Sequence, residues 1–289
     1  MNVIESFNLS KNYGKEVGIK NINLEIKKGE VYGFIGPNGA GKSTFIRTLL
    51  GFLIPSSGSA KIFGQAIDQN SHIIRKKIGY LPSEVHYYDG MTSRELLEYH
   101  ARFYDNSDIQ SINDLANLFE LELDRKIEEL SFGNKKKCAI LQSIIHQPEL
   151  LILDEPTSGL DPLMQNRFFE LLEKENKKGT TIFFSSHILT EVQRMCNRAA
   201  IIRKGEINAI ENIQDLLEKQ MKKARFIFKE KTDIQFIDGI QNPTWTNNKL
   251  TFDYVGPINH LIKWMNQLDL VDAVLEEPDL ETIFMNYYQ

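Results

Sequence analysis

The sequence has few cysteines, no long apolar run and no excess of positive charge. Its two cysteines, Cys138 and Cys196, form no CxxC pair and no zinc-like spacing with histidine, so we expect a reducing compartment. The net charge of −5 argues against a nucleic-acid partner. No run of about 18 apolar residues is present, so a role at a membrane would need a partner protein. Met1–Ser10 lacks a basic segment followed by an apolar run, which predicts no signal peptide.

The pattern of the sequence changes near residue 212. Before it, short β-rich segments alternate with helical patterns, which predicts an α/β domain over residues 1–212 with a mainly parallel sheet. Residues of about 90–128 show only helical spacing and predict a helical insertion. Residues 213–289 predict a small α+β domain, with a tight turn at Asn247-Asn248 and a final helix over Leu280–Tyr288.

A glycine-rich loop follows the apolar strand pattern Val31–Ile35 and precedes a helical pattern over Ser43–Leu50. It matches the phosphate-loop pattern GxxxxGK[ST]. Small residues let backbone N–H groups close on phosphates, and the helix N-terminus adds partial positive charge. Lys42 is predicted to reach the β- and γ-phosphate oxygens and Ser43 to ligate Mg²⁺. The alternative is a plain glycine-rich turn, which the strand and helix context disfavours. The loop comprises Gly36, Pro37, Asn38, Gly39, Ala40, Gly41, Lys42, Ser43 and Thr44.

Two carboxylates follow the buried strand pattern Leu150–Leu153. The carboxyl ends of such strands are where ligands bind in open α/β sheets. Asp154 is predicted to hold Mg²⁺, and Glu155 to orient or deprotonate the attacking water. Acidic strand ends are common, but the upstream phosphate loop favours the catalytic interpretation.

Further motifs join these two in a fixed order. They are an LSxG-type segment at Leu130–Gly133, an ILDEP run, Ser158–Asp161 and Ser185–His187. In this order and spacing the chain resembles the ATPases of the ABC family over roughly residues 1–215. The resemblance implies an α/β fold: a P-loop NTPase core with a mainly parallel sheet, an N-terminal antiparallel β subdomain and a helical insertion. The first thirty residues accordingly predict short strands, Val3–Asn8 and Ile22–Ile26.

The resemblance also implies roles for single residues. Tyr13 is similar to the aromatic residue that stacks on adenine, although a surface tyrosine of a strand is the alternative. Asp161 resembles the residue that links the two sites of an ATPase dimer. His187 resembles the histidine that contacts the γ-phosphate and the catalytic carboxylate. Without the resemblance, a lone histidine after an apolar strand would be interpreted as structural.

The signature segment reads LSFGN, where the family usually has LSGGQ. Ser131, Gly133 and Asn134 resemble the residues that contact the γ-phosphate of ATP held by the opposite protomer, although Ser131 by itself reads as a helix cap. Phe132 and Asn134 are similar to variants in the drug-, peptide- and lantibiotic-exporter branch. The three lysines Lys135–Lys137 predict a solvated helix face, with a raised potential for a triphosphate as the alternative.

A second departure follows Ile78–Pro82, where the family usually has a glutamine that senses Mg²⁺ and the membrane partner. Ser83 and Glu84 stand there instead. Nearby aromatic residues either line a docking cleft for a membrane partner or form the core of the helical insertion, and the sequence favours neither. They are Tyr80, Tyr87, Tyr88 and Tyr99.

The resemblance implies an ATPase that uses ATP and Mg²⁺, closes as a dimer with a second protomer (a homodimer in the simplest case) and drives a membrane-spanning subunit from the cytoplasmic face of the membrane. Phe132, Asn134 and the LEDxF-like ending Leu280–Phe284 favour an exporter. An importer ATPase is the nearest alternative. A non-transport ATPase acting on DNA or ribosomes is disfavoured, since neither a long coiled coil nor a second cassette is present. An inactive subunit is disfavoured by Lys42 and Glu155, together with Asp154 and His187.

Overall fold

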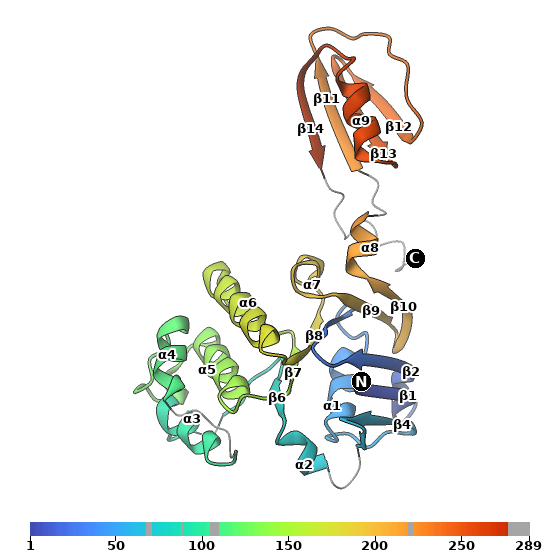
Figure 1. The fold of residues 1–289 in the computed structure, drawn as a ribbon. Coiled ribbons are helices and arrows are strands. Elements are labelled where there is room, and N and C mark those ends of the chain that lie inside the picture. The colour runs from blue at the N-terminus through green and yellow to red at the C-terminus, as the bar shows by residue number, and fades with distance from the viewer. Residues whose placement is uncertain (68–70, 88, 105–109, 219–221, 277–289) are drawn as a thin grey trace. The chain divides into compact units, whose positions relative to one another are not determined.

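The computed structural model describes residues 1–67, 71–87, 89–104, 110–218 and 222–276. The chain forms two compact units, Met1–Glu211 and Asn212–Gln289. The ribbon in Figure 1 labels the elements of both units. Among the described residues, no helix is long and apolar enough to cross a membrane. The expected helix Leu280–Tyr288 and the ending Leu280–Phe284 lie outside the described residues.

The first unit begins with an antiparallel sheet of order β2-β1-β4-β5. The expected short strands at the N-terminus are wrong in length, because β1 and β2 each continue for 12 residues. Asn8 and Asn21 have positive φ angles of 47° and 51°, and the β1–β2 register shifts between Ser6 and Leu9. These irregularities interrupt the period of two that identifies a strand in the sequence. The strands are β1 (Asn2–Tyr13), β2 (Glu16–Lys27), β4 (Ser57–Ile62) and β5 (Gln65–Ala66).

A second sheet has the order β10-β9-β3-β8-β7-β6, with parallel pairing between β9, β3, β8, β7 and β6. The α/β prediction is therefore confirmed. Helix α1 (Lys42–Leu49) packs against strands of both sheets, and Phe45 lies 5.0 Å from Phe34 between ring centroids. The strands are β3 (Val31–Ile35), β6 (Ile78–Leu81), β7 (Leu150–Asp154), β8 (Thr181–Ser186), β9 (Arg198–Arg203) and β10 (Glu206–Asn212).

The predicted helical insertion contains α3, α4 and the short η1, and α5 follows it. Thr92 and Glu95 form a capping box that starts α3. Helix α4 packs against α5 and α6 (Figure 1). The helices are α2 (Ser71–Arg75), α3 (Ser93–Ala101), α4 (Ser111–Phe119), η1 (Ile127–Glu129), α5 (Phe132–Ile144), α6 (Pro162–Lys177) and α7 (Leu189–Met195).

The second unit contains an antiparallel sheet of order β12-β13-β11-β14. Leu261 and Trp264 of α9 are buried against this sheet, with Trp264 edge-on to Phe252. In the tight turn of the hairpin only Asn247 of the asparagine pair has a positive φ, of 56°. The elements are α8 (Ile213–Glu218), β11 (Lys222–Phe228), β12 (Ile240–Thr246), β13 (Lys249–Tyr254), α9 (Ile258–Met265) and β14 (Leu270–Glu276).

Candidate active site

The glycine-rich loop connects the buried strand β3 to α1. Gly41 has a φ of 108°, and a Cβ atom there would lie 2.5 Å from the carbonyl oxygen of Gly18. Only glycine therefore fits this position. The side chain of Lys42 is 5% exposed and folds back over the loop. Its Nζ donates to the carbonyl oxygens of Gly36 at 2.7 Å and Pro37 at 3.1 Å. The loop is thus held in a curled conformation by its own lysine.

Two carboxylates stand at the end of β7, and the second of them, Glu155, contacts this lysine. Asp154 is fully buried and accepts a hydrogen bond of 2.6 Å from the hydroxyl of Ser185. Its second oxygen, Oδ2, is buried and has no hydrogen-bond partner among the described residues. Glu155 Oε1 lies 3.2 Å from Lys42 Nζ and 3.4 Å from His187 Nδ1. One carboxylate oxygen therefore lies within reach of both the phosphate-loop lysine and the histidine.

A hollow of about 610 Å³ opens over these groups. Gly39 and the run Lys42–Thr44 line it, and Glu155 lies at its base. The residues Ser83–His86 form a further part of the wall. Tyr13 is 47% exposed beside Thr44, with its hydroxyl 3.5 Å from the Thr44 hydroxyl oxygen. The lining also includes Asn38 and Gly41, whereas Gly36, Pro37 and Ala40 shape the loop behind it.

The signature segment and Asp161 lie at helix starts. Ser131 caps α5 by accepting the Asn134 backbone N–H at 3.3 Å. Gly133 packs closely on the backbone of Gly159, since a Cβ atom there would lie 2.8 Å from the Gly159 carbonyl oxygen. Asp161 caps α6 by accepting the backbone N–H groups of Leu163 and Met164. In this single chain none of the described side chains of Ser131, Gly133, Asn134 or Asp161 lines the hollow, although Phe132 does.

The position of His187 depends on a buried carboxylate that the sequence analysis missed. Glu191, in the first turn of α7, is 6% exposed. It accepts hydrogen bonds from Thr157, two residues after Glu155, and from Ser186, which directly precedes His187. Glu191 therefore joins the two loops that carry the carboxylate and the histidine. The sequence gives one signal, an acidic residue four positions after the histidine, but such residues are common in first helical turns.

The expected solvated face for the three lysines after the signature is wrong for Lys136. This residue is fully buried, whereas Lys135 and Lys137 are half-buried. Position 136 lies on the side of α5 that also buries Ala139 and Ile140, because residues three and four apart share one face of a helix. Because lysine is a charged residue type, the sequence did not indicate that position 136 is buried.

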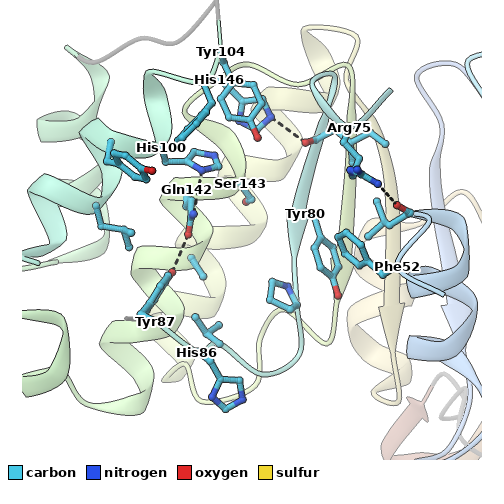
Figure 2. A pocket seen from close by; sticks show the side chains of 18 of the residues that line it. Phe52, Arg75, Tyr80, His86, Tyr87, His100, Tyr104, Gln142, Ser143 and His146 are labelled. Carbon is cyan, nitrogen blue, oxygen red and sulfur yellow. Dashed lines mark hydrogen bonds between the residues drawn. The ribbon is translucent and has the colours of Figure 1, made fainter. Parts of the chain in front are cut away.

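An apolar pocket of about 510 Å³ adjoins the hollow beside the phosphate loop (the nucleotide hollow), since Val85 and His86 line both cavities (Figure 2). Three of the four singled-out tyrosines, Tyr80, Tyr87 and Tyr99, line it, and Tyr88 lies outside the described residues. Tyr87 donates to the side-chain oxygen of Gln142 at 3.1 Å, and the Gln142 amide nitrogen lies 3.1 Å from Nδ1 of His100. Burial lowers the pKa of His100 to about 4, so this wall is uncharged at neutral pH.

Comparisons with known proteins agree with this geometry. The family profile described as ABC transporter matches residues 19–158. The chain is 37% identical to the bacitracin transport ATP-binding protein of Bacillus licheniformis, over 76% of this chain and 73% of that protein. It is 35% identical to the linearmycin resistance ATP-binding protein of Bacillus subtilis, over 75% of this chain and 71% of that protein.

Solved structures give the same result. An ATP-binding subunit of an ABC transporter matches with a TM-score of 0.70 and 30% identity, over 74% of this chain and 91% of that one. A dimeric ATP-binding cassette in a post-hydrolysis state with ADP and Pi matches with a TM-score of 0.67 and 25% identity, over 73% of this chain and 98% of that one. This chain therefore belongs to the ABC transporter family, as an ATP-binding subunit that hydrolyses ATP.

Proposed function

We propose that the chain powers an exporter by hydrolysing Mg²⁺-bound ATP between two protomers attached to a membrane-spanning subunit. The observation that carries the catalytic part is the contact of Glu155 with both Lys42 and His187. The exporter part is supported by the relatives whose names refer to bacitracin transport and linearmycin resistance. An importer remains the alternative that the experiment below separates from it.

In this proposal each residue of the hollow has a distinct task. The backbone N–H groups of the phosphate loop surround the β- and γ-phosphates, and Lys42 exchanges its contact with Glu155 for one with phosphate oxygens. Glu155 then orients the attacking water and accepts its proton. His187 holds Glu155 and donates to the γ-phosphate. Tyr13, exposed beside Thr44, stacks on the adenine ring.

The residues of the hollow fit Mg²⁺. Asp154 Oδ2 is a buried acceptor without a partner among the described residues, and Ser43 lines the hollow. Carboxylate and hydroxyl oxygens together with substrate phosphates are the ligands that Mg²⁺ prefers. In the part of the chain that the structure describes, no group of three or more acidic, histidine or cysteine side chains is arranged to hold a metal ion. When bound, Mg²⁺ neutralises charge that develops on the phosphate oxygens.

A second protomer completes the site in this proposal. Ser131, Gly133 and Asn134 begin an exposed helix N-terminus, which is suited to the γ-phosphate on the opposite protomer. Asp161, two residues after the Gly159 on which Gly133 packs, links the two sites in this proposal. Apolar side chains exposed close to these segments support an interface: Phe132, Leu163 and Ile188. We propose a homodimer because one chain carries both the catalytic and the signature residues.

The apolar pocket in Figure 2 is the proposed contact for the membrane-spanning subunit, because its wall shares Val85 and His86 with the nucleotide hollow. Contact there would place the ATPase at the cytoplasmic face of the membrane. Residues 1–212 form the proposed ATPase domain, and residues 213–289 an accessory domain.

The test is reconstitution with a membrane-spanning protein that co-purifies with this chain from membranes. Vesicles containing both proteins, with the ATPase on the outside, should take up a labelled peptide antibiotic only with ATP, since uptake into such vesicles corresponds to export from a cell. Glu155→Gln should abolish uptake, and the surface change Glu149→Gln is the matched control. Movement in the opposite direction would indicate an importer, and ATP turnover without movement of any cargo would contradict a transport role.

A further inference from the structure

Lys136 is a buried cation to which the proposed mechanism gives no task. Its Nζ donates to the carbonyl oxygens of Pro82 at 2.8 Å and Ser83 at 3.1 Å. Burial lowers the pKa of Lys136 to about 8, while the nearby carboxylates of Asp154 and Glu155 favour its charged form. Burying an ammonium group is costly unless its hydrogen bonds are satisfied, and an apolar side chain would fill this space at lower cost. The lysine therefore does more than fill the core.

The segment that Lys136 holds separates two cavities. Ser83 and Glu84 face the nucleotide hollow, whereas Pro82 faces the apolar pocket. Val85 and His86 line both cavities. A shift of the backbone at Pro82–Ser83 would therefore move a wall of both cavities.

Lys136 itself lies in helix α5. The N-terminus of this helix is the signature segment, and one to two turns beyond Lys136 the residues Ala139, Gln142 and Ser143 line the apolar pocket. The hydrogen bonds of Lys136 thus connect α5 directly to the start of the segment that stands where related ATPases have a glutamine, and the Tyr87–Gln142 bond connects the same helix to its end.

We propose that Lys136 is a positioning residue: its ammonium group holds the Pro82–Ser83 backbone and so keeps residues 83–86 in place, which line the nucleotide hollow and through Val85 and His86 also the apolar pocket. The inference rests on the roles proposed for Lys42 and Glu155. Lys42 is held separately by Gly36 and Pro37. Loss of the Lys136 contacts should therefore disturb turnover much more than ATP binding.

The experiment compares Lys136→Met, which removes the charge and both donors at similar length, with Lys136→Arg, which restores a cation. Lys137→Met on the same helix is the control, since Lys137 is half-buried and makes no contact used in the mechanism. Basal ATPase activity of the purified full chain gives kcat and KM. Amide hydrogen exchange by mass spectrometry compares residues 82–87 with residues 150–154.

Lys136→Met should lower kcat roughly ten- to hundredfold, as expected for a displaced active-site wall, with KM for ATP changed less than about twofold. Exchange of residues 82–87 should rise about tenfold or more without a rise in β7. Lys136→Arg should recover most of kcat, and Lys137→Met should match the unchanged chain. If Lys136→Met does not melt cooperatively, the same kinetic and exchange measurements are made on Lys136→Gln, which keeps a donor amide.

Unchanged kcat in Lys136→Met, a parallel rise in KM, or exchange that increases throughout the first unit would overturn the inference. The proposed function fails separately. If Glu155→Gln turned over ATP like the unchanged chain, the catalytic assignment would be wrong; if only the Lys136 variants behaved normally, the positioning role alone would be wrong.

Discussion

The contact between Lys42 and Glu155 predicts that Glu155→Gln strengthens nucleotide binding and lowers ATP turnover. The two side chains are 5% and 21% exposed and lie 3.2 Å apart, so a phosphate group must displace Glu155 to reach Lys42. Hydrogen bonds between charged groups contribute about 1.5–3 kcal/mol. Because the glutamine oxygen still accepts a weaker bond, the change should favour nucleotide binding by about 1–2 kcal/mol, or roughly five- to thirtyfold in Kd. Turnover should fall on the order of 10²–10⁴-fold because the general base is lost.

Titration calorimetry with a non-hydrolysable ATP analogue measures Kd, and phosphate release measures turnover. Glu149→Gln is the control, since Glu149 pairs with Lys77 at the surface at 2.8 Å. Sedimentation with ATP should show a stable dimer of the Glu155→Gln chain. Weaker or unchanged analogue binding would refute the competition between Glu155 and phosphate, and near-normal turnover would refute Glu155 as the base.

Three further predictions concern separate parts of the first unit. Lys42→Ala should abolish most ATP binding and turnover, as measured by the same two assays, and near-normal ATPase activity would contradict the phosphate-loop assignment. Glu191→Ala removes the acceptor of two buried hydrogen bonds and should lower the free energy of unfolding by about 2–4 kcal/mol in urea titrations; a loss below about 1 kcal/mol would show that the bridge to the His187 loop is unimportant. His100 has its pKa lowered from 6.5 to about 4 by burial and, to a smaller degree, by His146, so the folded chain binds fewer protons than the unfolded chain between these values and stability falls as the pH falls. Between pH 7 and pH 5 this should cost up to about 2 kcal/mol that His100→Gln does not lose, and equal pH dependence of unfolding in the two proteins would contradict the assignment.

Much of the fold was predictable because its signals are local. The apolar run Val31–Ile35 and the following glycine-rich loop identify a buried strand and a phosphate loop within a few residues. The helical spacing of residues of about 90–128 likewise identifies the helical insertion. The N-terminal strands were predicted too short because positive φ angles at Asn8 and Asn21 break the alternation inside continuous strands.

Local residue patterns are enough to identify the chemical groups and their order, because the phosphate loop, Asp154-Glu155 and the signature are runs of neighbouring residues whose types are demanded by phosphate chemistry. How these groups meet in space follows from the packing of the fold. Glu155 reaches Lys42 across the sheet, and Glu191 joins the loops of two strands. Lys136 looked like one of three surface charges, yet its bonds to Pro82 and Ser83 come from a segment more than fifty positions earlier in the chain. Contacts over such separations depend on how strands and helices pack, which no local pattern of residues records.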